Sequence, residues 1–205
     1  ISRMKGISRD RGLRRKRTPG YPMGWKRGVI SKGYNPALAR DNVEVIDTGI
    51  ECITATGVRT RDGTEHPAEV LIYGTGFQAT EFLSPMQITG RDGIELNQAW
   101  RDGAEAYLGI TVHGFPNLFM LYGPNTNLGH SSIVYMLESQ IQYVMDSLRT
   151  MDERNARSLE VHEASQQVFN LALQQQIRNT VWDKGCTSWY KTDSGKNTNN
   201  WPGFT

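Results

Sequence analysis

Cysteine is scarce in this 205-residue chain, in which only Cys52 and Cys186 occur. Two cysteines give neither a disulfide framework nor metal-ligand spacing, so we expect no metal site and a reducing, cytoplasmic setting. No apolar run approaches the roughly 20 residues that span a bilayer, and no signal-peptide pattern opens the chain, so we expect no membrane partner. A P-loop, a G-x-S-x-G elbow and an assignable pair of catalytic carboxylates are also absent.

Charge is distributed unevenly along the chain. Residues 1–40 carry 12 Lys or Arg and one acid, whereas residues 41–205 carry 11 Lys or Arg and 20 acids. A basic block of this kind can bind phosphates, but a solvated chain end explains it equally well. We therefore interpret residues 1–20 as a flexible basic segment, and we expect no nucleic-acid partner because nothing else indicates one.

The stretch that organises the sequence begins at Leu118. Leu118–Tyr122 is a continuous apolar run, which is typical of a strand buried on both faces, and Gly123 and Pro124 end it. Apolar residues then recur with the spacing of one helix face, at Ile133, Leu137, Ile141, Val144, Leu148 and Met151. A strand, a tight turn and a helix in this order place the turn where open α/β sheets bind ligands, although any βα unit shows the same order.

A small antiparallel β meander is predicted over residues 42–72. Asn42–Ile46 alternates like a half-buried strand. Ile50–Thr54 and Gly57–Thr60 are predicted as short strands, and Asp62-Gly63 favours a hairpin turn in which both residues have positive φ. Nothing in this meander indicates chemistry.

Val70–Tyr73 is predicted as another buried strand, followed by Gly74-Thr-Gly76-Phe-Gln-Ala79. These six residues match the G-x-G-x-x-A form of the dinucleotide fingerprint. We reject the match, because a fingerprint needs a long helix directly after its glycines and Pro85 follows within six residues of Ala79. Two glycines at the end of a strand still allow close approach to the backbone.

Other features have both a functional and a structural interpretation. Lys26 and Arg27 lie in a loop rich in Gly and Pro, where they could clamp a phosphate or simply be surface charge. His113 is isolated and is expected to be structural. A second helix is predicted over residues 161–182, with one core stripe of Phe169, Leu173, Ile177 and Val181. The tail that begins at Cys186 is rich in aromatic residues, so we expect it to pack against another surface.

Four motifs occur in an order that one known family shares. Glu69–Phe77 has nearly the form of a D-x-x-x-x-A-T-G-[FY] strand, and Phe115–His130 contains a P-N-L-F-x-x-x-G-P-N segment. The helix from Ile133 to Val144 continues the second motif, and Thr180–Gly203 is similar to the family's closing segment. The chain therefore resembles the carboxy-terminal portion of class B flavoprotein monooxygenases, in particular the Baeyer–Villiger, 4-hydroxyacetophenone monooxygenase-like branch.

This resemblance implies an α/β fold, as part of a flavoprotein with two Rossmann-type dinucleotide-binding domains that bind FAD and NADPH separately. NADPH would reduce the flavin, O2 would add to give a C4a-peroxyflavin, and one oxygen atom would enter a ketone. Residues 21–75 would be the carboxy-terminal end of the NADPH-binding domain, and residues 76–205 that of the FAD-binding domain.

The resemblance also implies roles for individual residues. Arg27 would be catalytic, because it would stabilise the anionic peroxyflavin, and Lys26 would contact the 2′-phosphate of NADPH. Trp189 would touch the nicotinamide ribose. Backbone N–H groups of a loop would approach the pyrimidine edge of the flavin; this loop comprises Gly123, Pro124, Asn125, Thr126, Asn127 and Leu128. The crossover between the two domains would comprise Tyr73, Gly74, Thr75, Gly76 and Phe77.

The chain also departs from the family pattern. Both dinucleotide fingerprints and the Baeyer–Villiger signature F-x-G-x-x-x-H-x-x-x-W-P are absent, and Gly74 replaces the usual Ala. The first residue is Ile1 rather than an initiator Met, which indicates a piece of a longer protein. We therefore expect the 205 residues alone to bind neither cofactor tightly and to be inactive.

Two alternatives remain open. An N- or S-oxygenating flavin monooxygenase would act on an amine or a sulfide instead of a ketone. A non-catalytic remnant would bind a partner, or self-associate, through apolar surfaces that missing domains once covered.

Overall fold

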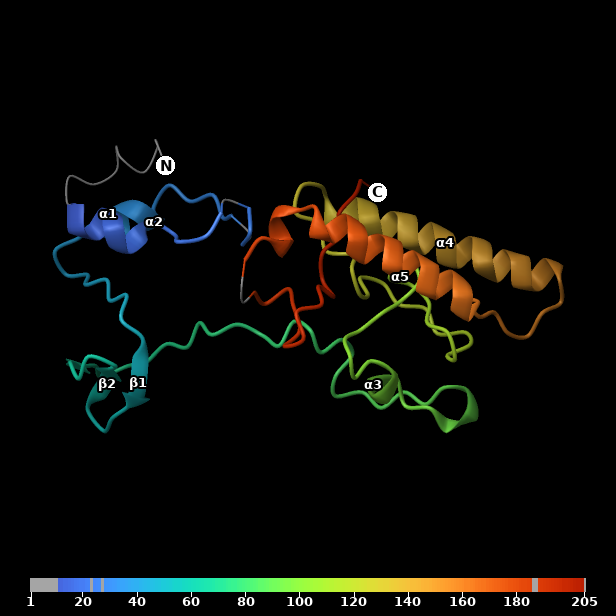
Figure 1. The fold of residues 1–205 in the computed structure, drawn as a ribbon, viewed down its shortest axis with the longest axis horizontal. Helices are drawn as coiled ribbons and strands as arrows, with labels where there is room; N and C mark the ends of the chain where they lie inside the picture. The colour runs from blue at the N-terminus through green and yellow to red at the C-terminus, as the bar shows by residue number, and fades with distance from the viewer. Residues whose placement is uncertain (1–10, 23, 27, 186–187, 205) are drawn as a thin grey trace. The chain divides into compact units, whose positions relative to one another are not determined.

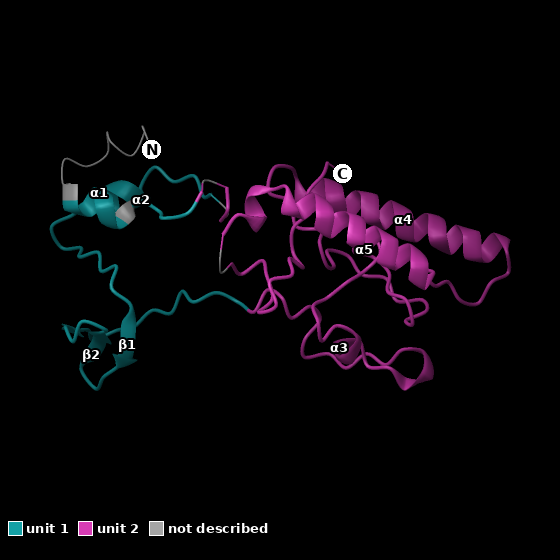
Figure 2. Ribbon diagram, in the orientation of Figure 1, with its two compact units in different colours: residues 1–21, 28–77 teal, residues 22–27, 78–205 magenta. Residues whose placement is uncertain are grey.

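The computed structural model describes residues 11–22, 24–26, 28–185 and 188–204. The chain divides into two units, which Figure 2 colours separately. Unit 1 comprises residues 1–21 and 28–77, and unit 2 comprises residues 22–27 and 78–205. The short stretch 22–27 therefore belongs with the later part of the chain, although unit 1 flanks it on both sides in the sequence.

Unit 1 contains a three-stranded antiparallel sheet in the order β1-β2-β3 (Figure 1). Its strands are β1 Ile50–Ile53, β2 Gly57–Thr60 and β3 Glu65–Pro67, and two short helices precede them, α1 Arg11–Arg17 and α2 Tyr34–Ala37. The predicted meander is therefore confirmed between residues 50 and 67. The prediction of a strand at Asn42–Ile46 is wrong, because this segment pairs with no strand among the described residues.

The turn between β2 and β3 is closed by a carboxylate as well as by backbone. Gly63 has φ +83°, whereas Asp62 does not have positive φ, so only one residue of the predicted pair has the conformation we expected. The Asp62 carboxylate accepts hydrogen bonds from the Thr60 hydroxyl (2.6 Å) and the Thr64 N–H (3.1 Å). These bonds, the first of them above all, hold the pKa of Asp62 below its usual value.

The two apolar runs predicted as buried strands are not strands in this structure. Val70–Tyr73 is extended but unpaired, and the exposed fraction reaches 75% at Val70 and 92% at Ile72. Leu118–Tyr122 forms no ladder either, and the side chains of its last two residues are exposed. A strand buried on both faces needs neighbouring strands and a covering layer, and the described part of this chain supplies neither to these runs. The residues that the structure describes therefore contain no Rossmann-type sheet.

Unit 2 is built from helices and long irregular segments. Its elements are η2 Arg91–Gly93, α3 Leu96–Ala99, α4 Ile133–Glu153, α5 Glu163–Arg178 and η3 Val181–Asp183. Figure 1 shows α4 and α5 as the two long helices of this unit. None of the helices in the described part of the chain combines the length and the apolar character that a bilayer span requires.

The main hydrophobic cluster of unit 2 lies in the irregular segments and α3 rather than between the long helices. Its buried members are Leu96, Trp100, Ala104, Ala106, Val112, Phe115 and Met120. The Trp100 ring meets Phe82 edge to face, with ring centroids 6.4 Å apart, and its Nε1 donates to the Glu105 carbonyl (2.9 Å). Side-chain packing thus fixes a region that has little regular hydrogen bonding.

Helix α4 confirms the predicted helix. Met136 and Gln140 are the buried residues of α4; of the apolar stripe, Ile141 and Leu148 are exposed and the other members are partly buried. Gln140 takes part in holding the coil: its Oε1 accepts from the Tyr122 N–H (2.9 Å) and its Nε2 donates to the Leu108 carbonyl (3.5 Å). For α5 the predicted core stripe is confirmed, since Leu173 and Ile177 are buried.

Glu160, in the connection between α4 and α5, ties that connection to the coil at residues 113–114. Its Oε1 accepts from the Gly114 N–H (2.7 Å) and lies 3.0 Å from His113 Nδ1, and its Oε2 pairs with Arg91. The Gly114 N–H, followed by the positive charge of Arg91, holds the pKa of Glu160 below its usual value. His113 is part of this structural cluster.

The Glu160 cluster makes stability depend on pH. A carboxyl whose pKa is lower in the folded than in the unfolded chain stabilises the fold above its unfolded pKa, and this stabilisation is lost as the pH falls through the folded value. We expect Glu160→Gln to lower the free energy of unfolding by about 1 kcal/mol at neutral pH, and the difference to vanish in acid. Urea unfolding at several pH values measures this, with Glu153→Gln at the exposed end of α4 as the control. A difference that stayed constant down to acid pH would contradict the assignment.

Candidate functional site

The predicted crossover residues lie in unit 1 and are exposed. Tyr73, Gly74, Thr75, Gly76 and Phe77 form an extended segment without regular hydrogen bonding, in which Gly76 has φ +84°. A Cβ on Gly74 or Gly76 would meet nothing within 4 Å. The described residues thus leave space beside these two glycines, as a site of close approach requires.

The loop Gly123–Leu128, which we call the GPN loop, lies in unit 2 and is largely buried. Gly123, Pro124, Asn125, Thr126 and Leu128 are buried, and Asn127 is partly buried. Asn125 has φ +57°, a conformation that Asn tolerates better than most residues. Gly123 is needed for packing, since a Cβ there would lie 2.3 Å from the Gly109 carbonyl oxygen.

The GPN loop pairs in parallel with residues Asn197–Trp201, which we call the tail segment. The Asn125 N–H donates to the Thr198 carbonyl (2.7 Å) and the Asn127 N–H donates to the Asn199 carbonyl (2.9 Å). The Trp201 N–H returns a bond to the Asn127 carbonyl (2.9 Å). The expectation that the aromatic tail packs on something is therefore confirmed.

This pairing divides the N–H groups of the GPN loop into two sets. Those of Asn125 and Asn127 are used by the tail segment, so they are not free to contact a ligand. Those of Gly123, Thr126 and Leu128 donate to no acceptor in the described part of the chain, although all three residues are buried. Buried N–H groups nearly always have a partner. The loop therefore offers three donors that suit the carbonyl oxygens of a bound group.

Trp25 anchors the stretch that carries Lys26 to unit 2. Its ring is buried and packs on Gly185, where a Cβ would lie only 2.6 Å from the ring. Val181 packs beside Gly24, 3.5 Å from where a Cβ would be. The Lys26 Nζ lies 5.6 Å from the centre of the Trp25 ring, a cation–π distance. Arg27, the predicted catalytic residue, lies outside the described residues.

Trp189 is half exposed, with 49% of its surface accessible. Its ring lies against that of Tyr190, with centroids 4.3 Å apart and an angle of 35° between the planes. Tyr190 itself is buried, and its carbonyl accepts from the Thr198 N–H (3.2 Å). The tail thus presents one face of Trp189 outward on a rigid support, as a stacking role would require.

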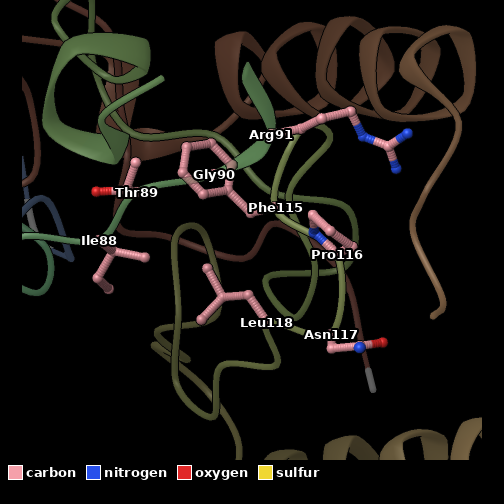
Figure 3. Close-up of a pocket in the computed structure, with 8 residues that line it drawn as sticks. All are labelled: Ile88, Thr89, Gly90, Arg91, Phe115, Pro116, Asn117 and Leu118. Atoms are coloured by element: carbon pink, nitrogen blue, oxygen red, sulfur yellow. The ribbon is translucent and has the colours of Figure 1, made fainter. Parts of the chain in front are cut away.

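A cavity of about 570 Å³ elsewhere in unit 2 contains none of the predicted site residues. Figure 3 shows Phe115 and Leu118 on its wall and the Arg91 guanidinium extending away from the other labelled side chains. Its lining is Ile88, Thr89, Gly90, Arg91, Phe115, Pro116, Asn117 and Leu118. Among the described residues, no group of three or more His, Cys, Asp or Glu could hold a metal ion.

The predicted site residues are divided between the two units. Lys26, the GPN loop and Trp189 all belong to unit 2, whereas the crossover residues belong to unit 1. Sequence reasoning missed Trp25 as an anchor and the tail segment as the partner of the GPN loop. A signal was present in the run Asn197-Thr-Asn-Asn200, because four consecutive polar residues just before Trp201 suit hydrogen bonding rather than core packing.

No protein-family model matches the chain. A Baeyer–Villiger monooxygenase of Pseudomonas aeruginosa is 48% identical over 199 residues, which is 96% of this chain and 38% of that protein. Among solved structures, a closed cyclohexanone monooxygenase matches with a TM-score of 0.85 and 28% identity, over 98% of this chain and 38% of that one. The structure titled OTEMO complex with FAD and NADP matches with a TM-score of 0.86 and 26% identity, over 98% and 39%.

These similarities confirm the resemblance that the motifs indicated. The chain spans about 38% of the length of the Pseudomonas aeruginosa relative, and 39% of a Baeyer–Villiger monooxygenase of Streptomyces coelicolor that is 41% identical to it. Similarity covers both units, since 96% or more of the chain is aligned in each case.

The contact between Trp25 and Gly185 predicts the effect of a single methyl group. Gly185→Ala would place that group 2.6 Å from the Trp25 ring, so the ring must move or the backbone must shift. We expect a loss of about 1–3 kcal/mol in the free energy of unfolding, and a red-shifted tryptophan emission as Trp25 becomes exposed. The control is Gly28→Ala, where the added group meets nothing within 4 Å. Equal stability of the two variants would show that Trp25 is not anchored at Gly185.

Proposed function

Because nearly the whole chain is homologous to part of the Baeyer–Villiger monooxygenases, we propose that it supplies the carboxy-terminal segment of an FAD- and NADPH-dependent monooxygenase. The enzyme would insert one oxygen atom from O2 into a ketone. The observation that carries the proposal is the 48% identity over 199 residues. Because the relatives are longer than this chain, residues outside these 205 would hold the rest of both cofactors.

The GPN loop would hold the pyrimidine edge of FAD. The N–H groups of Thr126 and Leu128 lack acceptors in the described part of the chain, and the flavin ring has carbonyl oxygens at that edge. When bound and reduced by NADPH, the flavin supplies the activation of O2. The chain's own contribution is to orient the ring and to keep water from one side of it, since the loop is buried.

Lys26 and Arg27 would each stabilise a negative charge. Lys26 would pair with the 2′-phosphate of NADPH, and Arg27 would supply a permanent positive charge beside the negative charge that develops in the reaction. Support comes from the anchoring of Trp25, which fixes the adjacent Lys26 to the unit that carries the GPN loop. Trp189, half exposed on its support, would contact the nicotinamide ribose.

Residues 21–75 would belong to the NADPH-binding domain, and residues 76–205 to the FAD-binding domain. Tyr73, Gly74, Thr75, Gly76 and Phe77 would be the crossover between them, where the absence of any atom near the two glycines suits approach by a dinucleotide. The cytoplasmic location expected from the sequence is part of the same proposal.

The first test is flavin retention. We expect the 205-residue chain to lose FAD on desalting, and a chimaera in which it replaces the homologous 38% of the Pseudomonas aeruginosa relative to keep it. The visible absorption spectrum measures both, with the intact relative as the control. Stoichiometric flavin on the chain alone would contradict the need for further residues. A flavin-loaded chimaera that oxygenates amines or sulfides but no ketone would favour the heteroatom branch.

Arg27 is tested in the flavin-loaded chimaera. We expect Arg27→Ala to reduce ester or lactone formation by about 10²- to 10³-fold, as the loss of one charge-stabilising group does. NADPH oxidation should continue, so the yield of product per NADPH consumed should fall. Lys26→Ala should instead raise the KM for NADPH more than the KM for NADH. Coupled product formation by Arg27→Ala would exclude a catalytic role for Arg27.

A non-catalytic remnant that self-associates is the second candidate, and the exposed run Val70–Tyr73 favours it. We would then expect concentration-dependent association of the 205-residue chain in analytical ultracentrifugation. Ile72→Asp, on a side chain that is 92% exposed, should abolish the association without affecting folding. A monomer at all concentrations would argue against this candidate.

A further inference from the structure

We propose that the tail segment Asn197–Trp201 is a positioning element for the flavin, acting through the side chain of Asn125 in the GPN loop. The inference rests on the proposed function, since it assumes that the GPN loop contacts flavin. It adds a part of the chain, more than 70 residues away in sequence, to the residues on which flavin binding depends.

The side-chain amide of Asn125 joins the GPN loop to the tail segment by hydrogen bonds, and we call this junction the clasp. Its Nδ2 donates to two carbonyl oxygens of the tail, those of Asn197 (2.8 Å) and Asn200 (3.2 Å). Its backbone N–H donates to a third, that of Thr198 (2.7 Å). One loop residue thus meets three tail carbonyls, and only a side chain with two N–H bonds can serve the first two.

Asn197 shapes the tail so that these carbonyls converge. Its Oδ1 accepts from the N–H groups of Asn199 (3.1 Å) and Asn200 (3.0 Å), and its Nδ2 donates to the Asn200 Oδ1 (2.9 Å). This is a side-chain-closed turn of the kind that Asn forms readily. The Asn197 side chain therefore supplies hydrogen bonds that close this turn from within the tail.

The rest of unit 2 holds the tail in place. Gln174 of α5 donates to the Asn197 carbonyl (2.8 Å), and the Thr198 N–H donates to the carbonyl of buried Tyr190. The Asn199 Nδ2 donates to the same Tyr190 carbonyl (3.3 Å). Asn197, Thr198 and Asn200 are each at most 2% exposed. A buried polar cluster with this many bonds is rigid, because every displacement breaks bonds that water cannot replace.

The positions of the free donors follow from this clasp. With Asn125 and Asn127 bonded to the tail, the other N–H groups of the loop, those of Gly123, Thr126 and Leu128, are left without an acceptor in the described residues. Without the tail, the loop could turn and all of these groups could find water. The tail therefore determines which donors the loop presents.

The cluster also contains two buried side-chain atoms that lack a hydrogen-bond partner in the described part of the chain, the Asn125 Oδ1 and the Asn200 Nδ2. One is an acceptor and the other a donor. Because buried polar atoms are rarely unpaired, both indicate that something beyond these residues completes the cluster. This agrees with a loop that is finished only in the flavin-bound enzyme.

Asn125→Asp tests the proposal in the complete enzyme that carries this chain. Asp keeps the shape and tolerates positive φ, but it removes both donors of the clasp. We expect faster hydrogen exchange at residues 123–128 of the flavin-free protein, an FAD Kd raised about tenfold, and a lower flavin reduction potential. The potential falls because misplaced N–H groups no longer stabilise the negative charge of the reduced ring. A general loss of packing would not by itself shift it.

Asn155→Asp is the matched control, because Asn155 is exposed and also has positive φ (48°). If Asn125→Asp does not fold, Asn197→Asp removes only the donor to Asn200 and should give smaller shifts in the same directions. Exchange, Kd and potential equal to those of the control would overturn the inference. If the unaltered enzyme bound no FAD, the proposed function would fail, while the exchange measurement would still report whether the tail orders the loop.

Discussion

The pairing of the GPN loop with the tail segment is the interaction on which the candidate site depends. Most of unit 2 outside α4 and α5 is irregular, so its buried backbone groups cannot rely on helix or sheet ladders for hydrogen bonds. Asn and Gln side chains provide the replacement: Asn125, Gln140 and Gln174 each bond to backbone groups far away in sequence. Amides suit this role because they donate and accept without bringing a charge into the interior.

A second constraint is that apolar runs need partners to become strands. Val70–Tyr73 and Leu118–Tyr122 have the composition of buried parallel strands, yet neither joins a ladder in the described residues. The relatives are more than twice as long as the chain, which spans 38% of the Pseudomonas aeruginosa protein. These two runs therefore have the composition of strands, but the strands that they would pair with are not among the described residues.

Close packing contacts explain why glycine occupies two positions, which a sequence motif alone does not explain. Gly123 belongs to a motif shared with flavoenzymes, but in this structure it also lets the loop pack on Gly109. Gly185 lies within the closing segment Thr180–Gly203, and it receives the ring of Trp25 that holds Lys26 to unit 2.

The sequence by itself determined the two long helices, the hairpin and the family resemblance. The periodic runs predicted α4 and α5, two short strand-like runs and Asp62-Gly63 predicted the hairpin, and four ordered motifs indicated the relationship that the comparisons confirm. These features depend on neighbours a few residues apart, so local preference is enough. Only the tertiary structure decided which face of α4 is buried, that Trp25 packs on Gly185, and that Asn125 binds a tail more than 70 residues away. Such contacts join distant segments whose individual preferences are weak, and their geometry exists only once the whole unit has folded.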